Sequence, residues 1–157
     1  EMWIPGEGTL NPGTGFLRPV SSTTLTNPAT AIRAITVGAY DSLTFSYADF
    51  SGRGPLTGES ASAVKPDLVA PGVNVSTISV GGGVAEFSGT SFATPFVTGS
   101  AALLMEWGIV RGNDSYLYGE KVKAYLRRGA RSLPGIEKYP NEMVGYGRLC
   151  LSESIPD

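Results

Sequence analysis

The stretch Phe87–Gly99, F-S-G-T-S-F-A-T-P-F-V-T-G, decides the fold. It follows a glycine turn at 81–83 and leads into an apolar run, so Ser91 lies where a strand would pass into a helix. A helix N-terminus presents unbonded backbone N–H groups and the positive end of the helix dipole, which together stabilise an oxyanion. The position therefore suits a nucleophilic serine. Serine and threonine are also common helix caps, a role that needs no chemistry.

Two residues bear on where the helix begins. Gly89 allows the chain to turn sharply before Ser91, which favours a helix that starts near the serine. Pro95 is tolerated near a first helical turn, because few N–H groups are bonded there. It could equally be the first helical residue with Thr94 as the cap, which would leave Ser91 in the preceding loop.

The rest of the chain alternates short β-branched runs with longer periodic segments. The short runs are ended by glycine or proline and predict strands that are apolar on both faces, as in a parallel sheet. The predicted strands are 31–39, 67–72, 73–80 and 83–87, and the predicted helices are 91–110 and 116–128. Strands followed by helices predict an α/β layer architecture.

Composition excludes several functional classes. The 157 residues are 41% apolar and 17% charged, as expected for a folded domain, and the net charge of −2 gives no basic surface for nucleic acid. The run 92–110 is broken by polar residues and Pro95, so we expect a buried helix and no membrane partner. The single cysteine, Cys150, permits no internal disulfide and is expected to be buried. A cluster of basic residues at helical spacing predicts a solvated face: Lys121, Lys123, Arg127, Arg128 and Arg131.

The pattern around Ser91 is wider than a lone G-T-S. The segment G-T-S-x-A-x-P-x-x-x-G, followed by A-A-L-L, resembles the nucleophile segment of the subtilisin-like serine proteases, the subtilases. The resemblance extends over about 27–151, with order and spacing in agreement. Its further segments are T-V-G-A at 36–39, S-G-R-G-P at 51–55, K-P-D-L-V-A-P-G at 65–72 and G-Y-G-R-L at 145–149.

The resemblance implies a fold and a set of site residues. The fold would be the C-terminal part of a three-layer α/β structure, with a mainly parallel sheet flanked by helices. Ser91 would be the nucleophile, its own N–H an oxyanion donor, and Thr90 would line the same hole. One wall of the substrate pocket is expected at Thr26, Asn27 and Pro28, with Pro28 following a cis peptide bond.

The chain holds no histidine, so the general base that the family uses is missing. The family's histidine, aspartate and oxyanion asparagine all precede the matched region, and the start at Glu1 looks like a cut end. We therefore expect the partner to be the N-terminal part of the same protease. These residues alone are expected to be inactive and able to associate with a second copy. Lys65 could act as a base in a Ser-Lys dyad, but a lysine in this context is more often a surface charge.

The remaining expectations concern domains, substrate and cofactors. Residues 1–25 are interpreted as the tail of an inserted β-rich module and 26–157 as catalytic domain, which resembles the clostridial germination-protease branch with its inserted jelly roll. The resemblance implies a protein or peptide substrate and a secreted, cell-envelope or spore location. No cofactor is assigned, and calcium is suggested by the resemblance only. The alternative function is a non-catalytic pseudoprotease, or an interaction module on the same fold.

Overall fold

The structure is a computed structural model that describes residues 4, 8–55 and 63–156. Its centre is a pair of parallel strands, β1 (Val37–Tyr40) and β2 (Leu68–Pro71), in which Ala39 lies opposite Ala70. Both strands are almost wholly buried, as continuous apolar runs predict for a parallel sheet. The segment 145–149 continues the arrangement, because Leu149 N–H donates to Val69 and Val69 N–H to Gly147, at 2.8 and 2.9 Å.

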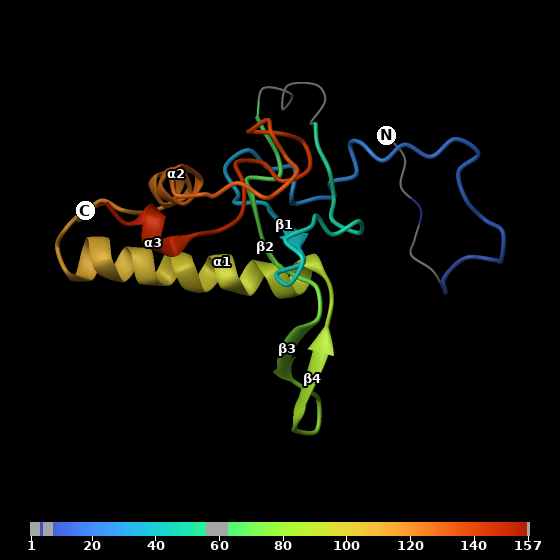
Figure 1. Cartoon of the computed structure of the whole chain (residues 1–157), viewed down its shortest axis with the longest axis horizontal. Coiled ribbons are helices and arrows are strands. Elements are labelled where there is room, and N and C mark those ends of the chain that lie inside the picture. The colour runs from blue at the N-terminus through green and yellow to red at the C-terminus, as the bar shows by residue number, and fades with distance from the viewer. Residues whose placement is uncertain (1–3, 5–7, 56–62, 157) are drawn as a thin grey trace.

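Helix α1 (Thr90–Met105) packs against both strands (Figure 1) and continues into a π-helical turn, η2 (Glu106–Val110). Its buried face carries Ala93, Val97, Ser100 and Leu104, the spacing of one helical stripe. The helix begins at Thr90 and contains Pro95 in its interior, so the alternative start with Thr94 as the cap is wrong. Ser91 therefore lies inside the first turn.

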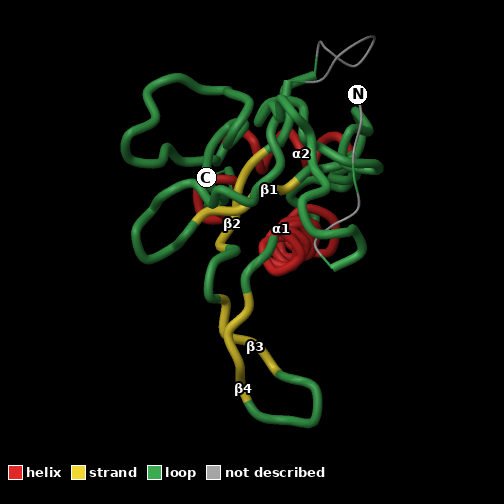
Figure 2. The backbone as a smooth tube through the Cα atoms, turned by 90° about the vertical axis from the view of Figure 1, so that its right-hand side faces the viewer, coloured by secondary structure: helices red, strands yellow, loops and turns green. Residues whose placement is uncertain are grey.

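A β-hairpin leads into α1. Strands β3 (Val75–Ile78) and β4 (Val84–Phe87) pair antiparallel and project from the body of the molecule (Figures 1 and 2). The tip at 81–83 consists of three glycines with positive φ, a conformation that side chains disfavour. The predicted strands at 73–80 and 83–87 are confirmed with shorter bounds.

Two further helices lie beside α1. Helix α2 (Glu120–Arg128) begins later than the predicted 116, because Gly119 has a φ of 51° and Leu117 instead packs in the core against Gly108. Helix α3 (Leu151–Ser154) was not predicted and contacts α1 and α2. Cys150, expected to be buried, is only half-buried at the start of α3.

The strand predicted at 31–39 is shorter than expected, since only Val37–Tyr40 forms β1. The carbonyls of Ile32 and Ala34, which a longer strand would use in its ladder, accept hydrogen bonds from lysine side chains instead. Segment 31–36 is consequently irregular.

The described elements form an α/β fold with a parallel strand pair against α1, as predicted. By length and composition, Thr90–Val110 would also suit a membrane span, with a hydropathy of 1.2. The core helix of a globular protein passes the same test. The N-terminal residues 8–20 run away from the body and are exposed, apart from the half-buried Leu10. The domain boundary at 25/26 stays a prediction.

Candidate active site

Ser91 is the second residue of α1 and is exposed, whereas Thr90 before it is half-buried. No side-chain hydrogen bond caps this helix N-terminus within the described residues, and its first turn carries no acidic side chain. The Ser91 N–H lies in the first helical turn, whose backbone N–H groups have no intrahelical acceptor. The helix dipole makes this end of the helix positive. The arrangement can therefore receive a negatively charged oxygen beside the serine hydroxyl.

The chain that enters α1 is fixed by the central strands. Gly89 N–H donates to Gly72 at 2.8 Å, and Gly72 N–H donates to Tyr40 at 3.0 Å, which ties the start of the helix to β1 and the end of β2. On the hairpin side, Phe87 and Phe92 stack with ring centroids 5.2 Å apart. Ser91 is thus held at a rigid junction.

A cavity of about 450 Å³ lies beside this junction. Thr90 and Thr26 both line it, so the structure brings together two of the residues that the sequence assigned to the site. Asn27 and Pro28 are exposed and do not line the cavity, although Ala29 directly after them does. The Asn27–Pro28 peptide bond is cis, as expected.

Segment 49–53 also lines the cavity, and its residues 51–53 belong to the matched segment S-G-R-G-P. Asp49 and Arg53 are the two charged residues among those that line it. The Arg53 guanidinium lies 4.8 Å from the centre of the Tyr47 ring, and Thr24 N–H donates to the Arg53 carbonyl at 2.9 Å. The lining is therefore both polar and charged.

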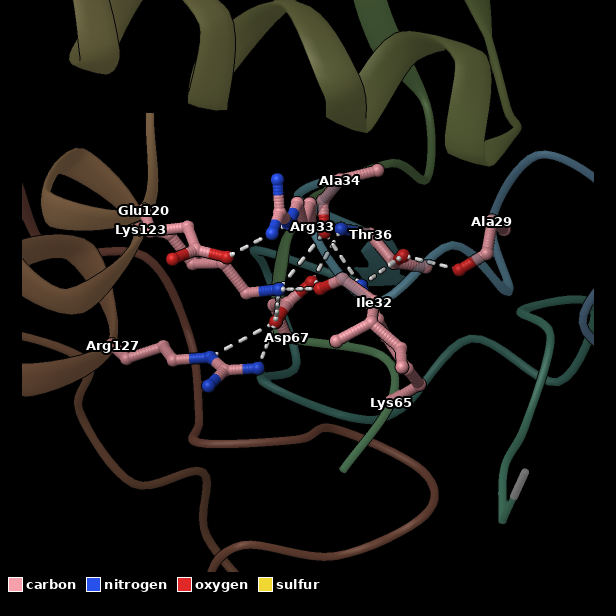
Figure 3. Close-up of polar contacts among 10 residues, drawn as sticks. All are labelled: Ala29, Ile32, Arg33, Ala34, Thr36, Lys65, Asp67, Glu120, Lys123 and Arg127. Atoms are coloured by element: carbon pink, nitrogen blue, oxygen red, sulfur yellow. Dashed lines mark hydrogen bonds and ion pairs between the residues drawn. The ribbon is translucent and has the colours of Figure 1, made fainter. Parts of the chain in front are cut away.

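A buried group of charges lies behind the cavity (Figure 3), and we call Lys65, Asp67, Lys123 and Arg127 the Asp67 cluster. Asp67 is completely buried, and its Oδ2 accepts from Lys65 Nζ at 2.8 Å and from Thr36 N–H at 2.6 Å. Its Oδ1 accepts from Arg127 Nε at 2.9 Å and lies 3.1 Å from Lys123 Nζ. One carboxylate thus holds three cations from two distant parts of the chain.

The surroundings shift the pKa of two members of the Asp67 cluster. Burial alone would raise the pKa of Asp67, but hydrogen bonds from Lys65 and Thr36 and the charge of Lys123 outweigh it, so this pKa lies below its ordinary value. Burial lowers the pKa of Lys65, and the Asp67 carboxylate only partly opposes that effect. Asp67 is therefore ionised at neutral pH.

These positions correct two sequence interpretations. Lys65 is 1% exposed, so it is not a surface charge, and Lys123 is also buried within the predicted solvated face. Lys65 Nζ donates to Ala34 at 2.6 Å, to Thr36 Oγ1 at 2.9 Å and to Asp67 at 2.8 Å, which occupies all three of its N–H bonds. A lysine so engaged has no free lone pair with which to take a proton from Ser91.

No group of three or more histidine, cysteine or acidic residues that could hold a metal ion is found in the described ranges.

Comparison with known proteins agrees with this geometry. A family model described as the subtilase family matches residues 13–147. The membrane-bound transcription factor site-1 protease of Mus musculus is 37% identical over 131 residues, which cover 82% of this chain and 12% of that protein. The serine protease AprX of Bacillus subtilis is 30% identical over 155 residues, 86% of this chain and 32% of that protein.

Solved structures give the same result. The CspB protease of Clostridium perfringens superposes with a TM-score of 0.85 at 47% identity, over 92% of this chain and 30% of that chain. The prenylagaramide maturation protease PagA superposes with a TM-score of 0.68 at 30% identity, over 85% of this chain and 46% of that chain. The chain thus spans a third or less of the curated relatives named above and under half of these solved chains. With the family match over most of its length, the chain belongs to the subtilase family.

Proposed function

We propose that this chain carries the nucleophile of a serine endopeptidase, Ser91. The observation that supports it most directly is an exposed serine in the uncapped first turn of α1, next to a cavity that Thr90 and Thr26 line. The relatives named above are proteases, and the matched region includes this turn.

The proposed reaction proceeds through an acyl-enzyme. Ser91 Oγ attacks the carbonyl carbon of the scissile peptide bond as a general base takes the hydroxyl proton, and the Ser91 N–H stabilises the resulting oxyanion. The C–N bond then breaks, the leaving amine receives the proton, and an ester remains on Ser91. Water hydrolyses the ester and restores the serine. The substrate is a protein or peptide.

The cavity is proposed to receive a substrate side chain. Thr90 would lie at the oxyanion end, with Thr26 and Ala29 contributing one wall, while Asn27 and Pro28 connect these two residues outside the lining. Asp49 and Arg53 extend the lining with opposite charges.

The general base is proposed to come from outside these 157 residues. The chain contains no histidine, and Lys65 uses all of its N–H bonds within the Asp67 cluster. The aspartate that orients the histidine, and the asparagine that supplies the second oxyanion donor, are proposed to come from the same source. The matched solved structure is covered for only 30% of its chain, which leaves ample length for these residues.

The partner is proposed to be the N-terminal part of the same protease. Helix α1 and η2 turn an apolar face to solvent, with Leu103 54% exposed, Val110 78% exposed and Phe96 43% exposed. Apolar side chains arranged in this way on one helix indicate a surface that another chain segment covers. The part that supplies the base would bury this face.

Substitution of Ser91 tests the function. In the complete protease, S91A should lower kcat by at least about 10⁴-fold and abolish labelling by a fluorophosphonate probe, because the attacking oxygen is gone. The matched control is S76A, an exposed serine on β3, which should leave both readouts unchanged. The isolated 157 residues should not cleave peptides. Peptide cleavage by the isolated chain that S91A abolishes would show that the base lies within the chain.

A further inference from the structure

Thr36 lines the cavity and also contacts the Asp67 cluster. It lines the 450 Å³ cavity beside Thr90, and it is buried with 6% of its surface exposed. In Figure 3 it lies between the cluster and Ala29, another residue of the cavity wall. This single residue therefore connects the buried charges with the candidate substrate site.

Each polar atom of Thr36 has a specific partner. Its N–H donates to Asp67 Oδ2 at 2.6 Å, and its hydroxyl accepts from Lys65 Nζ at 2.9 Å. The same hydroxyl donates to the Ala29 carbonyl at 2.6 Å. The result is an unbroken path of hydrogen bonds from the buried carboxylate to the wall of the cavity.

Lysine side chains hold the chain between these two wall residues. Lys123 Nζ donates to the carbonyls of Ile32 and Ala34 at 2.6 and 3.0 Å, and Lys65 Nζ donates to Ala34 at 2.6 Å. Residues 31–36 form no strand, so these bonds replace a sheet ladder as the tether of the segment. The position of the wall thus depends on the charges behind it.

We propose that Thr36 and Lys123 are positioning residues that set the shape of the substrate cavity, by coupling the Asp67 cluster to wall segment 26–37. The proposal rests on the proposed function, because it takes the cavity as the substrate site. Displacement of a binding wall by a fraction of an ångström weakens and redirects binding without touching the reacting atoms. The effect should appear in KM and in substrate selectivity and should leave kcat largely unchanged.

Thr36→Val tests the first link, because valine keeps the shape of the side chain and removes only the hydroxyl. In the complete protease, T36V should raise KM about fivefold, the factor expected for the lost hydrogen bond to the Ala29 carbonyl in the cavity wall, and change kcat less than about twofold. It should also change the ratio of kcat/KM between peptides with a small and a large P1 side chain. T36S keeps the hydroxyl and should restore the values of the original protein.

Lys123→Met tests the second link and keeps the experiment decisive if T36V does not fold. Methionine preserves the apolar stem and removes the bonds to Ile32 and Ala34. Amide hydrogen exchange of residues 29–36 should become about fivefold faster, and KM should rise. The matched control is K121M on the same helix, whose ammonium binds Asp114 at the surface. It should change neither readout.

Each alternative outcome contradicts the proposal. A lower melting temperature with unchanged KM and unchanged P1 ratio would show that these residues only stabilise the fold. Equal effects of T36V and T36S would exclude the hydroxyl as the link. Failure of the proposed function has a different signature, because no activity or fluorophosphonate labelling would then depend on Ser91: either the original protein shows none, or S91A keeps both, whatever residue stands at 36.

Discussion

At the scale of single residues, Asp67 is a fully buried carboxylate surrounded by charged partners. A carboxylate without exposed surface is stable only if hydrogen bonds and opposite charges replace its water, and here Lys65, Lys123, Arg127 and the Thr36 N–H do so. Removal of one partner from such a group lowers the free energy of unfolding strongly, because the charges that remain stay buried. Replacement of the whole group by well-packed apolar side chains would cost far less.

Asp67→Asn should therefore destabilise the protein by about 3–5 kcal/mol at neutral pH, since three cations lose their common carboxylate. The pKa of Asp67 lies below its ordinary value of 3.8, so its contribution is present above that pH and disappears as pH falls through the lower folded-state pKa. The difference between D67N and the original protein in free energy of unfolding should shrink in acid. Urea denaturation at neutral pH and at about pH 2 measures it.

The control for this prediction is Asp49→Asn, an exposed carboxylate on the cavity wall, which should change stability by less than about 0.5 kcal/mol. A D67N penalty of the same size at both pH values would show that packing, and not the charge of Asp67, stabilises the cluster.

The start of helix α1 next to Ser91 could be predicted from sequence, whereas the Asp67 cluster could not. A local pattern, G-T-S before an apolar run, predicts that Thr90 and Ser91 lie where the helix begins. Lys65 and Lys123 were interpreted as surface charges, because lysine is rarely buried and nothing local shows that two lysines 58 positions apart share one aspartate. One signal for the cluster was present in the sequence: Lys65 lies two residues before Asp67, and Asp67 directly precedes a wholly apolar strand.

At the scale of elements, α1 and the hairpin follow their sequence patterns and segment 31–36 does not. The predicted helix 91–110 is found as α1 and η2 because its buried stripe repeats at helical spacing. Segment 31–36 has a strand-like composition, yet it forms no strand. Its Ile32 and Ala34 carbonyls accept hydrogen bonds from the side chains of Lys123, on α2, and Lys65. Tertiary contacts of this kind override β propensity.

The turn at 141–147 gives a prediction at this scale. Gly145 has a φ of 57°, and a Cβ there would overlap the carbonyl oxygens of Pro66 and Asp67 at the start of β2. Gly145→Ala should therefore cost about 3–5 kcal/mol, from the strained backbone conformation together with the steric overlap. Thermal unfolding measures the loss.

Gly135→Ala is the matched control for this turn. Gly135 also has a positive φ, of 77°, but a Cβ there would meet no atom within 4 Å. G135A should cost only the conformational part, about 1–2 kcal/mol. Equal losses for the two variants would mean that the turn does not need the close approach of Gly145 to β2.

At the scale of the whole molecule, the described residues form a core against one face of α1 and leave apolar side chains exposed on another face of the same helix. Ala93, Val97 and Leu104 are buried against β1, β2 and the neighbouring helices. Outside this buried stripe, α1 and η2 expose Phe96, Leu103 and Val110. Helix α1 thus has both a face buried in the core and exposed apolar side chains. The candidate nucleophile, Ser91, lies at its N-terminus.

The isolated chain should associate with itself through this face, because burial of exposed apolar side chains is favourable by about 25 cal/mol per Å². Sedimentation at increasing protein concentration should show a growing fraction of dimer or larger species.

The double variant Leu103→Gln, Val110→Gln tests this face. It should shift the association midpoint at least about tenfold to higher concentration, since two large apolar contacts are lost. Leu43→Gln is the control: Leu43 is 84% exposed but lies in the loop after β1, so the variant should associate like the original chain. In the complete protease the same double variant should lower activity, because it weakens the proposed contact with the part that supplies the base. A concentration-independent monomer of the isolated chain, or full activity of the double variant, would contradict the assignment of this face as the contact with the part that supplies the base.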